Sequence, residues 1–479
     1  MDYVENRTFD EIKVGDSASL VRILTKDDIS LFAVMSGDVN PAHVDEEYAK
    51  SDMFHKIIAH GMWGGALIST LLGTKLPGPG TIYLGQTLRF SRPVALGDTI
   101  TVSVRAAGKD ERKHRVTFEC ECVNQRGEAV IKGEADVIAP TEKVKRPRAI
   151  LPAVHLHDRG ARYRELIDLT KGLAPIRTAV VHPVDRYSLL GALDAAQANL
   201  IVPILIGPEA KIRAAAEAAD VDLGPYRLIP TAHSHEAAAR AVAMARAGEV
   251  EALMKGSLHT DELMHEVLAR ESGLATERRV SHVFVMDVPT YPRPLFITDA
   301  AINIAPDLDG KRDIVQNAID LARVLGIESP RVAILSAVET VTRKLPSTLD
   351  AAALCKMADR GQITGGVVDG PLAFDNAISE EAAQLKAIAS PVAGRADILL
   401  VPDVEAGNML VKQLGYLAEA QGAGVVLGAR VPIILTSRAD TVLARMASCA
   451  VALVAARRGH GGAVTQTAPG VGESVGVVG

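Results

Sequence analysis

Residues 81–138 alternate between apolar and polar side chains in four stretches. Residues 81–90, 98–106, 114–123 and 128–138 are rich in β-branched and aromatic residues, and short polar segments separate them. Alternation with a period of two is typical of half-buried strands, and short connections favour antiparallel pairing. The pattern therefore predicts an antiparallel meander.

Two stretches with helical periodicity precede these strands, at residues 26–35 and 61–73. The second carries glycine and alanine on one side, so another element must approach its backbone closely. An antiparallel sheet wrapped round one helix of small residues is an α+β arrangement.

The pattern changes at about residue 160. From there to residue 459, short β-branched runs alternate with alanine-rich helical stretches. This alternation indicates an α/β fold with a mainly parallel sheet that is covered by helices on both faces. Ligands of such sheets bind beyond the carboxyl ends of the strands, and polar residues gather there in this sequence.

Four segments follow from these patterns. We expect one domain over residues 1–138 and a second over residues 161–459. Residues 139–160 are rich in proline and basic residues, which is typical of a linker. Residues 460–479 are low in complexity and are expected to form a mobile tail.

Composition narrows the classes of partner. A net charge of -6 over 479 residues argues against a nucleic-acid partner, which needs a basic stripe. No apolar run approaches the ~18 residues of a membrane span, and the polar N-terminus has no signal-peptide core, so we expect a cytosolic protein. Cys120 and Cys122 alternate with apolar residues on one face of a predicted strand, so we interpret them as buried side chains rather than zinc ligands.

The stretch SGDVNPAHVD, residues 36–45, holds the first candidate site. Gly37 suits a left-handed helix end, and Pro41 suits the start of a second helix with Asn40 as its cap. Asp38 then lies in the turn and His43 in the first turn of the new helix, near enough to face one another. From spacing alone, the two residues fit solvated turn and cap positions as well as an acid–base pair.

A second element favours the acid–base pair. His60 and Gly61 stand at the start of the helix of small residues. Backbone amides at a helix N-terminus carry partial positive charge and have no partner in the helix, so they suit a thioester oxygen as its charge grows. A glycine at this position equally suits a tight entry turn.

Together these residues resemble the MaoC-like, (R)-specific enoyl-CoA hydratases. The matching motifs are GDVNPAHVDEEYA, IAHGMW and LPGPGTIYLGQTLRFSRPVALGD, in the order and spacing of that family. The resemblance covers residues 5–138 and implies a hot-dog fold that is active as a dimer. It also implies that Asp38 and His43 add water across a trans-2-enoyl-CoA double bond, giving an (R)-3-hydroxyacyl-CoA. Asp38 would accept the proton of the water and His43 would orient the water and protonate the α-carbon, although the residues do not decide which does which. The Gly61 amide would polarise the thioester carbonyl.

Two strand-to-helix junctions in the second half suit phosphate. Ser437 and Asp440 fit a capping box, whereas Arg438 at the end of a predicted strand suits bidentate phosphate binding. KGSLHT, residues 255–260, places Lys255, Gly256 and Thr260 at another junction, as in a phosphate cradle. Neither a P-loop nor a dinucleotide fingerprint is present, which disfavours ATP and NAD.

Further polar clusters follow other predicted strands. Their carboxylates could be metal ligands, but such residues more often cap helices and line clefts, so we expect no metal. The candidates are Asp299, Asn303, Asp369, Gly370, Asp403, Gly407 and Asn408.

In combination these motifs resemble the phosphate acetyl/butyryltransferase family. The resemblance covers residues 160–456 through KGSLHT, TDAAINIAPD, DGPLAFDNAIS, VPDVEAGNML and TSRAD. It implies a two-subdomain α/β/α fold related to the isocitrate and isopropylmalate dehydrogenases, a dimer, and no metal or redox cofactor. The implied reaction is acyl-CoA plus phosphate giving acyl phosphate plus CoA. By analogy, Ser437 and Arg438 stabilise charge on the acyl carbonyl and the phosphate, and an aspartate takes the proton of the CoA thiol. In the last predicted helix, Asp440 is the aspartate available for this role.

The two resemblances predict a bifunctional enzyme. We expect CoA thioesters, phosphate and acyl phosphate as its small-molecule partners, and no tightly bound cofactor. We also expect a homo-oligomer that binds neither nucleic acid nor a membrane. The alternative is that one domain is catalytic and the other is retained as a CoA-ester-binding or oligomerisation module.

Overall fold

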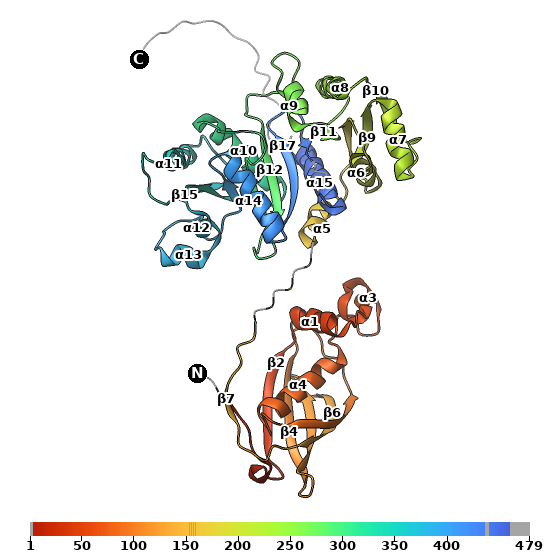
Figure 1. Cartoon of the computed structure of the whole chain (residues 1–479), viewed down its shortest axis with the longest axis vertical. Coiled ribbons are helices and arrows are strands. Elements are labelled where there is room, and N and C mark those ends of the chain that lie inside the picture. The colour runs from red at the N-terminus through yellow and green to blue at the C-terminus, as the bar shows by residue number, and fades with distance from the viewer. Residues whose placement is uncertain are drawn as a thin grey trace. The chain divides into compact units, whose positions relative to one another are not determined.

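The computed structural model describes residues 3–152, 154, 156, 158, 160–435 and 440–459 (Figure 1). The chain divides into two compact units between residues 157 and 158. The predicted tail, residues 460–479, lies outside the described residues. Among the described helices, none is both long and apolar enough to cross a bilayer.

The first unit is a five-stranded antiparallel sheet with one long helix, α4 (Gly61–Thr74), across a face (Figure 1). Its core consists of α4 side chains such as Ile68 and Leu71 packed on inward-facing strand residues such as Val102 and Phe118. This is the predicted α+β arrangement of a hot-dog domain. The strands, in sheet order, are β2 (Ser17–Ile23), β4 (Thr99–Asp110), β5 (Arg115–Val123), β6 (Ala129–Ile138) and β3 (Ile82–Phe90).

The prediction of a simple meander is wrong for β3. This strand pairs with β6 rather than with β4, its neighbour in sequence. The connection over residues 91–98 does not turn back tightly, because it forms a bridge between Ala95 and Ile58, and Val94 accepts a hydrogen bond from the Ala59 amide. These contacts with the segment before α4 carry the chain across to the other side of the sheet.

The predicted close approach to α4 is present. A Cβ atom at Gly64 would lie 2.3 Å from the Ile131 side chain, and one at Gly65 would lie 3.1 Å from Leu88. Strands β6 and β3 therefore pack directly on the helix backbone at these two positions.

The first unit extends further than predicted. Strand β7 (Lys145–Pro147) pairs with β1 (Tyr3–Glu5), and the Asn6 side chain accepts a hydrogen bond from the Val144 amide at 2.9 Å. Ala139 is buried in the core. Residues 139–147 thus belong to the first unit rather than to the predicted linker. Composition misled because short edge strands tolerate proline and basic residues.

The second unit is built on a mixed sheet to which eleven of the described strands belong. The strands, in sheet order, are β10 (Arg227–Pro230), β9 (Ile201–Gly207), β8 (Ile176–Val181), β11 (Ala252–Lys255), β18 (Ile433–Ile434), β17 (Gln421–Leu427), β12 (Ser281–Asp287), β13 (Leu295–Thr298), β16 (Ile398–Leu400), β14 (Arg331–Leu335) and β15 (Val367–Leu372). The helices are α5 (Ala161–Asp168), α6 (Arg186–Gln197), α7 (Glu209–Ala219), α8 (Ser234–Arg246), α9 (Thr260–Leu268), α10 (Leu308–Val324), α11 (Pro346–Asp359), α12 (Phe374–Ile378), α13 (Glu380–Leu385), α14 (Val404–Leu417) and α15 (Val442–Arg458).

This sheet contains two parallel groups that run in opposite directions. Strands β10, β9, β8, β11 and β18 are parallel, and so are β13, β16, β14 and β15. Between them, β17 is antiparallel to β18 and to β12, and β12 is antiparallel to β13, so the direction reverses three times. The two groups therefore point in opposite directions, but their carboxyl ends lie close in height along the sheet. Asp299, which follows β13, accepts a hydrogen bond from the His282 amide, and His282 is level, through Val426 and Ile433, with Leu253 of β11. The antiparallel strands β12 and β17 leave no trace in the alternation of strands and helices, so the sequence did not predict this reversal.

The four cysteines are free thiols. Cys120 and Cys122 are buried in the first core, and burial, the largest cause in both, raises the pKa of Cys120 to about 11 and that of Cys122 to about 12. They pack as small apolar side chains, as the alternation predicted.

Candidate active sites

The turn after α1 (Lys26–Ser36) has the predicted local structure. Gly37 ends the helix with φ 76° and donates its amide hydrogen to the Ala33 carbonyl. Asn40 caps α2 (Pro41–Val44) by accepting a hydrogen bond from the Ala42 amide, and Asp38 Oδ1 accepts one from the Asn40 amide at 3.2 Å. These backbone constraints present Asp38 and His43 toward each other.

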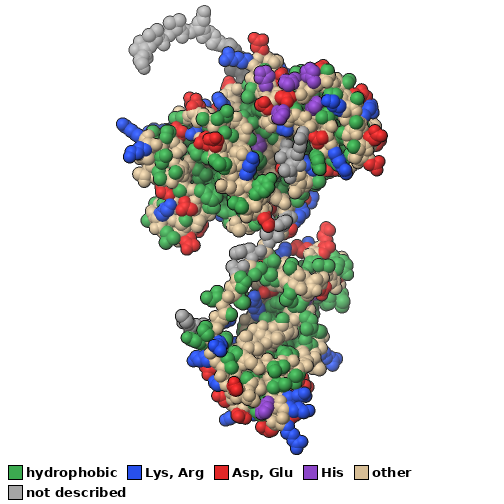
Figure 2. Space-filling model, viewed as in Figure 1, with side chains coloured by type: hydrophobic (Ala, Val, Ile, Leu, Met, Phe, Trp, Pro, Cys, Tyr) green, Lys and Arg blue, Asp and Glu red, His purple; other side chains and the backbone are tan. Residues whose placement is uncertain are grey.

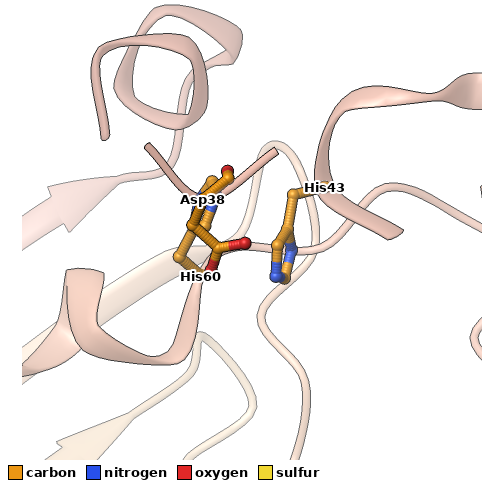
Figure 3. Close-up of side chains that lie close together, drawn as sticks. All are labelled: Asp38, His43 and His60. Atoms are coloured by element: carbon orange, nitrogen blue, oxygen red, sulfur yellow. The ribbon is translucent and has the colours of Figure 1, made fainter. Parts of the chain in front are cut away.

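A third residue, His60, completes the cluster in Figure 3. One carboxylate oxygen of Asp38 and one ring nitrogen each of His43 and His60 lie within 4.8 Å of one another. The two imidazole rings pack with centroids 4.0 Å apart, and the far side of His60 faces the Phe32 ring at 4.9 Å. His60 is buried, His43 is half-buried and Asp38 is exposed. The cluster thus runs from the core to the surface.

Backbone carbonyls fix which ring nitrogens carry hydrogen. His43 Nδ1 lies 2.9 Å from the Ile58 carbonyl, and His60 Nε2 lies 3.0 Å from the Asp38 carbonyl. A carbonyl oxygen only accepts, so each of these nitrogens must donate. Neutral His43 is left with a lone pair on Nε2, and neutral His60 with one on Nδ1, which is buried and has no hydrogen-bond partner.

An apolar cavity of about 310 Å³ lies beside this cluster. His43, His60 and Gly61 form part of its wall, and most of the remaining wall is apolar. The His60 side chain does not cap the N-terminus of α4, so the Gly61 and Met62 amides have no hydrogen-bond partner among the described residues. The site therefore offers an apolar chamber, helix amides and two acceptors in one place. The other residues of the wall are Phe54, Ile58, Ala59, Trp63, Gly64, Phe90, Ser91, Arg92, Pro93, Val94, Ile100, Val130 and Ile131.

The arrangement suits one water molecule. A carboxylate accepts hydrogen bonds only, and neutral His43 accepts at Nε2, so the two groups can each take one hydrogen of the same water. A water held in this way has its oxygen lone pairs directed away from both groups, available for attack on a carbon atom. The metal alternative is less well supported, because the rings of His43 and His60 are stacked with an interplanar angle of 36° and their in-plane lone pairs do not converge well on one ion.

In the second unit, Gly256 follows β11 at the edge where β8 also ends. Its amide donates to the Val181 carbonyl at 2.9 Å, and a Cβ atom at this position would lie 2.4 Å from that carbonyl oxygen. Only glycine allows the KGS segment to pack this closely on the end of β8. Lys255 and Thr260 are half-buried on either side, at the end of β11 and the start of α9.

Histidines gather round the neighbouring helices. His233 caps α8, and His259 caps α9 through a reciprocal pair of hydrogen bonds with Glu262. Figure 2 shows histidine side chains grouped on this face of the second unit. The sequence did not single them out, because no metal-ligand spacing connects them.

Asp299 and Asn303 are buried in the loop after β13, with 2% and 4% of their surface exposed. Asp299 accepts hydrogen bonds from the backbone amides of His282, Ala301 and Asn303 and, at 2.6 Å, from the Asn303 side chain. These contacts hold the loop after β13. Both side chains thus support this loop, and their predicted contact with a CoA ester stays a prediction.

His282 on β12 is a neighbour that the sequence did not reveal. It is fully buried, and burial, opposed by the charge of Asp299, lowers the pKa of His282 to about 4. Its Nδ1 has no hydrogen-bond partner. Only its packing against the Asp299 loop marks it.

The other predicted acidic residues cap helices or turns. Asp403 caps α14 by accepting a hydrogen bond from the Ala406 amide, and Asp369 accepts one from the Gly370 amide. A Cβ atom at Gly407 would lie 3.0 Å from Ala300, and the Asn408 side chain donates to the Ala300 carbonyl at 3.3 Å. The structure therefore joins the loop after β16 to the loop after β13, and Ile302 of the latter packs on the apolar cluster that contains Leu258, next to the KGS segment.

Ser437 and Arg438 lie outside the described residues. Asp440, which follows them, is half-buried, and Thr441 rather than Ser437 caps α15 by accepting a hydrogen bond from the Ala444 amide. Burial, followed by the charges of Asp287 and Asp440, raises the pKa of Tyr163 on α5. Asp440 therefore lies close to a buried phenol that the sequence did not single out.

Comparison with known proteins separates the two units. A family model described as phosphate acetyl/butaryl transferase matches residues 229–453, and one described as MaoC like domain matches residues 12–125. The phosphate acetyltransferase of Rhizobium meliloti is 65% identical over 299 residues, which are 62% of this chain and 95% of that protein.

Two solved structures align with different parts of the chain. A branched-chain phosphotransacylase from Enterococcus faecalis V583 is 29% identical with a TM-score of 0.52, over 59% of this chain and 99% of its own. An R-hydratase from Pseudomonas aeruginosa, in unliganded form, is 46% identical with a TM-score of 0.32, over 32% of this chain and 99% of its own. Since the curated relative is matched over nearly its whole length at high identity, the chain belongs to the phosphate acetyl/butaryl transferase family and carries a MaoC-like domain before the transferase.

Proposed function

We propose that the protein is a bifunctional enzyme of CoA thioesters. The first unit hydrates a trans-2-enoyl-CoA to an (R)-3-hydroxyacyl-CoA, and the second exchanges an acyl group between CoA and phosphate. The hydratase assignment rests on the Asp38–His43–His60 cluster beside an apolar cavity and a helix N-terminus. The transferase assignment rests on 65% identity to a phosphate acetyltransferase over 95% of that protein.

Hydration requires one proton and one hydroxyl group from the same water. Asp38 and His43 hold the water; the water oxygen bonds to the β-carbon of the enoyl group, and one proton of the water passes through the pair to the α-carbon. Negative charge that grows on the thioester oxygen during attack meets the first amides of α4, at Gly61. The apolar walls hold the acyl chain and exclude other water.

Phosphorolysis breaks the thioester bond. A phosphate oxygen bonds to the acyl carbon, the thiolate of CoA leaves, and a proton completes the thiol. Ser437 and Arg438 stabilise the charge on the acyl carbonyl and the phosphate. Asp440 exchanges the proton of the CoA thiol. The neighbouring strand end carries Lys255, Gly256 and Thr260. The pairing of β18 with β11 supports this grouping, because the segments after both strands begin at the same sheet edge.

We also propose that the second unit shares the two-subdomain architecture of the isocitrate and isopropylmalate dehydrogenases, and that the protein is a homo-oligomer. The mixed sheet with two opposed parallel groups supports the first proposal. The edge strand β3 supports the second, since Ile82, Leu84 and Phe90 on it are exposed.

Two variants of the full chain test both activities. Asp38→Asn removes the charge and the proton acceptor and should lower hydration of crotonyl-CoA, followed by enoyl absorbance without phosphate, by about 10² to 10⁴. Arg438→Ala should lower thiol release from acetyl- or butyryl-CoA with phosphate by about 10² to 10³. Each variant should retain the activity of the other unit, and an unchanged melting temperature of the altered unit shows that this unit is still folded. Normal hydration by Asp38→Asn contradicts the first assignment, and normal thiol release by Arg438→Ala contradicts the second.

A further inference from the structure

Arg445, on the second turn of α15, is a buried cation that the reaction described above does not use. Only 7% of its surface is exposed. Its Nε has no hydrogen-bond partner, and among the described residues no carboxylate or carbonyl bonds to its guanidinium. Arginine stays protonated in proteins, and buried charges are normally paired. The buried Nε lacks a partner, whereas the terminal nitrogens are not fully buried and are open to a ligand.

The fold makes room for this arginine at one position. A Cβ atom at Gly191 of α6 would lie 2.9 Å from Arg445 Cδ and 3.2 Å from Nε. The same point lies 3.9 Å from the end of the Met254 side chain. Arg445 therefore lies directly against α6 at Gly191, close to where the Met254 side chain also approaches, and the missing Cβ at Gly191 leaves space for it.

This position lies at the sheet edge of the proposed transferase site. Met254 directly precedes Lys255 and Gly256, and β11 pairs with β18, which leads to Ser437 and Arg438. Long side chains on a helix point back toward its N-terminus, so Arg445 reaches toward the start of α15 rather than away from the site. That N-terminus adds the partial positive charge of its amides.

We propose that Arg445 binds a phosphate group at the transferase centre, an inference that rests on the proposed acyl transfer. A planar guanidinium matches phosphate bidentately, and the bound anion supplies the countercharge that is absent from the described residues. The phosphate is that of inorganic phosphate or acyl phosphate, or one of the phosphates of CoA. Inorganic phosphate alone and CoA alone, added in separate experiments, distinguish the reacting phosphate from a phosphate of CoA.

Arg445→Met tests the proposal in the full chain. Met keeps the apolar stem and removes the charge, and Arg360→Met, at the exposed C-cap of α11, removes the same charge elsewhere. Melting temperatures are measured in anion-free buffer, with inorganic phosphate alone and with CoA alone. Crotonyl-CoA hydration by the same preparations reports that the first unit is intact.

The expected result has two parts. Without a ligand, Arg445→Met melts no lower than the wild type, because the buried charge has no partner to lose. Phosphate or CoA raises the melting temperature of the wild type and of Arg360→Met but not of Arg445→Met, and the KM for the same ligand rises about tenfold or more in Arg445→Met. Protection by phosphate alone identifies the reacting phosphate, and protection by CoA alone identifies a phosphate of CoA.

Two results overturn the proposal. One is a lower melting temperature of Arg445→Met in anion-free buffer together with unchanged protection by both ligands, which is the behaviour of a structural arginine. The other is an unchanged KM for both. Absence of acyl transfer in the wild type would instead contradict the proposed function. In that case, the thermal protection measured with and without Arg445 would still show whether this residue binds the phosphate group. Gly191→Ala, which crowds the arginine without removing it, should reproduce the rise in KM.

Discussion

His60 connects both members of the proposed acid–base pair, although neither connection involves the substrate. Its Nε2 donates to the Asp38 carbonyl at 3.0 Å, and its ring packs on that of His43 at 4.0 Å. His60→Phe separates the two contacts, because phenylalanine keeps a stacked ring and loses the hydrogen bond. We expect His60 to act as a positioning residue for Asp38.

The size of the effect follows from the bond that is lost. A neutral N–H···O=C hydrogen bond contributes about 1 kcal/mol net, which is about fivefold in a rate if the whole contribution reaches the transition state. Release of the turn allows Asp38 to shift, and a displacement of ~1 Å can cost ~10²-fold. We therefore expect kcat for hydration to fall between about 5-fold and 100-fold, with KM little changed because the cavity is intact.

Stability should behave differently. His60 Nδ1 is buried without a partner, and an unsatisfied buried polar atom costs about 1–3 kcal/mol. His60→Phe removes this cost together with the hydrogen bond, so the melting temperature of the first unit should stay the same or rise. A loss of activity without a loss of stability is the signature of a positioning role.

The assay follows enoyl absorbance with crotonyl-CoA across a range of pH, with wild type, His60→Phe and His235→Phe. His235 on α8 is the control, because it is an exposed histidine in regular helix, whereas His55 has a φ of 56° that a phenylalanine would adopt poorly. An unchanged kcat in His60→Phe refutes the reasoning, and so does a fall in kcat that is matched by a collapse of the melting temperature.

Three further predictions concern the rest of the chain. Gly256→Ala places a Cβ atom 2.4 Å from the Val181 carbonyl oxygen and should lower thiol release by about 10², with hydration retained; Gly415→Ala, whose nearest contact would be 3.8 Å, is the control. Gly133→Ala places one 1.8 Å from the Thr87 carbonyl oxygen between β6 and β3, so the first unit should lose hydration and melt lower while the transferase remains active. Hydrogen bonds from Arg457, chiefly, lower the pKa of Glu251 from 4.5 to about 2. Its stabilisation is complete above the unfolded pKa and is lost as pH falls from about 4.5 toward 2, so Glu251→Gln should lower the melting temperature at pH 7 and weaken its dependence on pH in that window.

Local signals in the sequence determined the proposed hydratase pair almost completely. The Gly37 helix end, the Asn40 cap and the Pro41 helix start are all present, because each depends on the backbone preferences of two or three neighbouring residues. His60 is different. Its partnership with Asp38 spans 22 residues of chain and depends on how α4 packs on the sheet.

The sequence did not determine the strand pairing, for a similar reason. Alternation marks which residues form a strand and which face is buried, but the partner and the direction depend on contacts distant in the chain. Thus β3 pairs with β6 instead of β4, and β17 and β12 reverse the strand direction in the middle of the second sheet.

The sequence by itself therefore determined the two units, their families and the residues of the first turn, since these follow from short-range patterns and motif order. Only the tertiary structure decided where each polar cluster lies along the sheet and which charges are left without a partner. Arg445 shows the reason. In sequence it is one more arginine on an alanine-rich helix, and only the packing of α15 against Gly191 of α6 buries its Nε without a partner among the described residues.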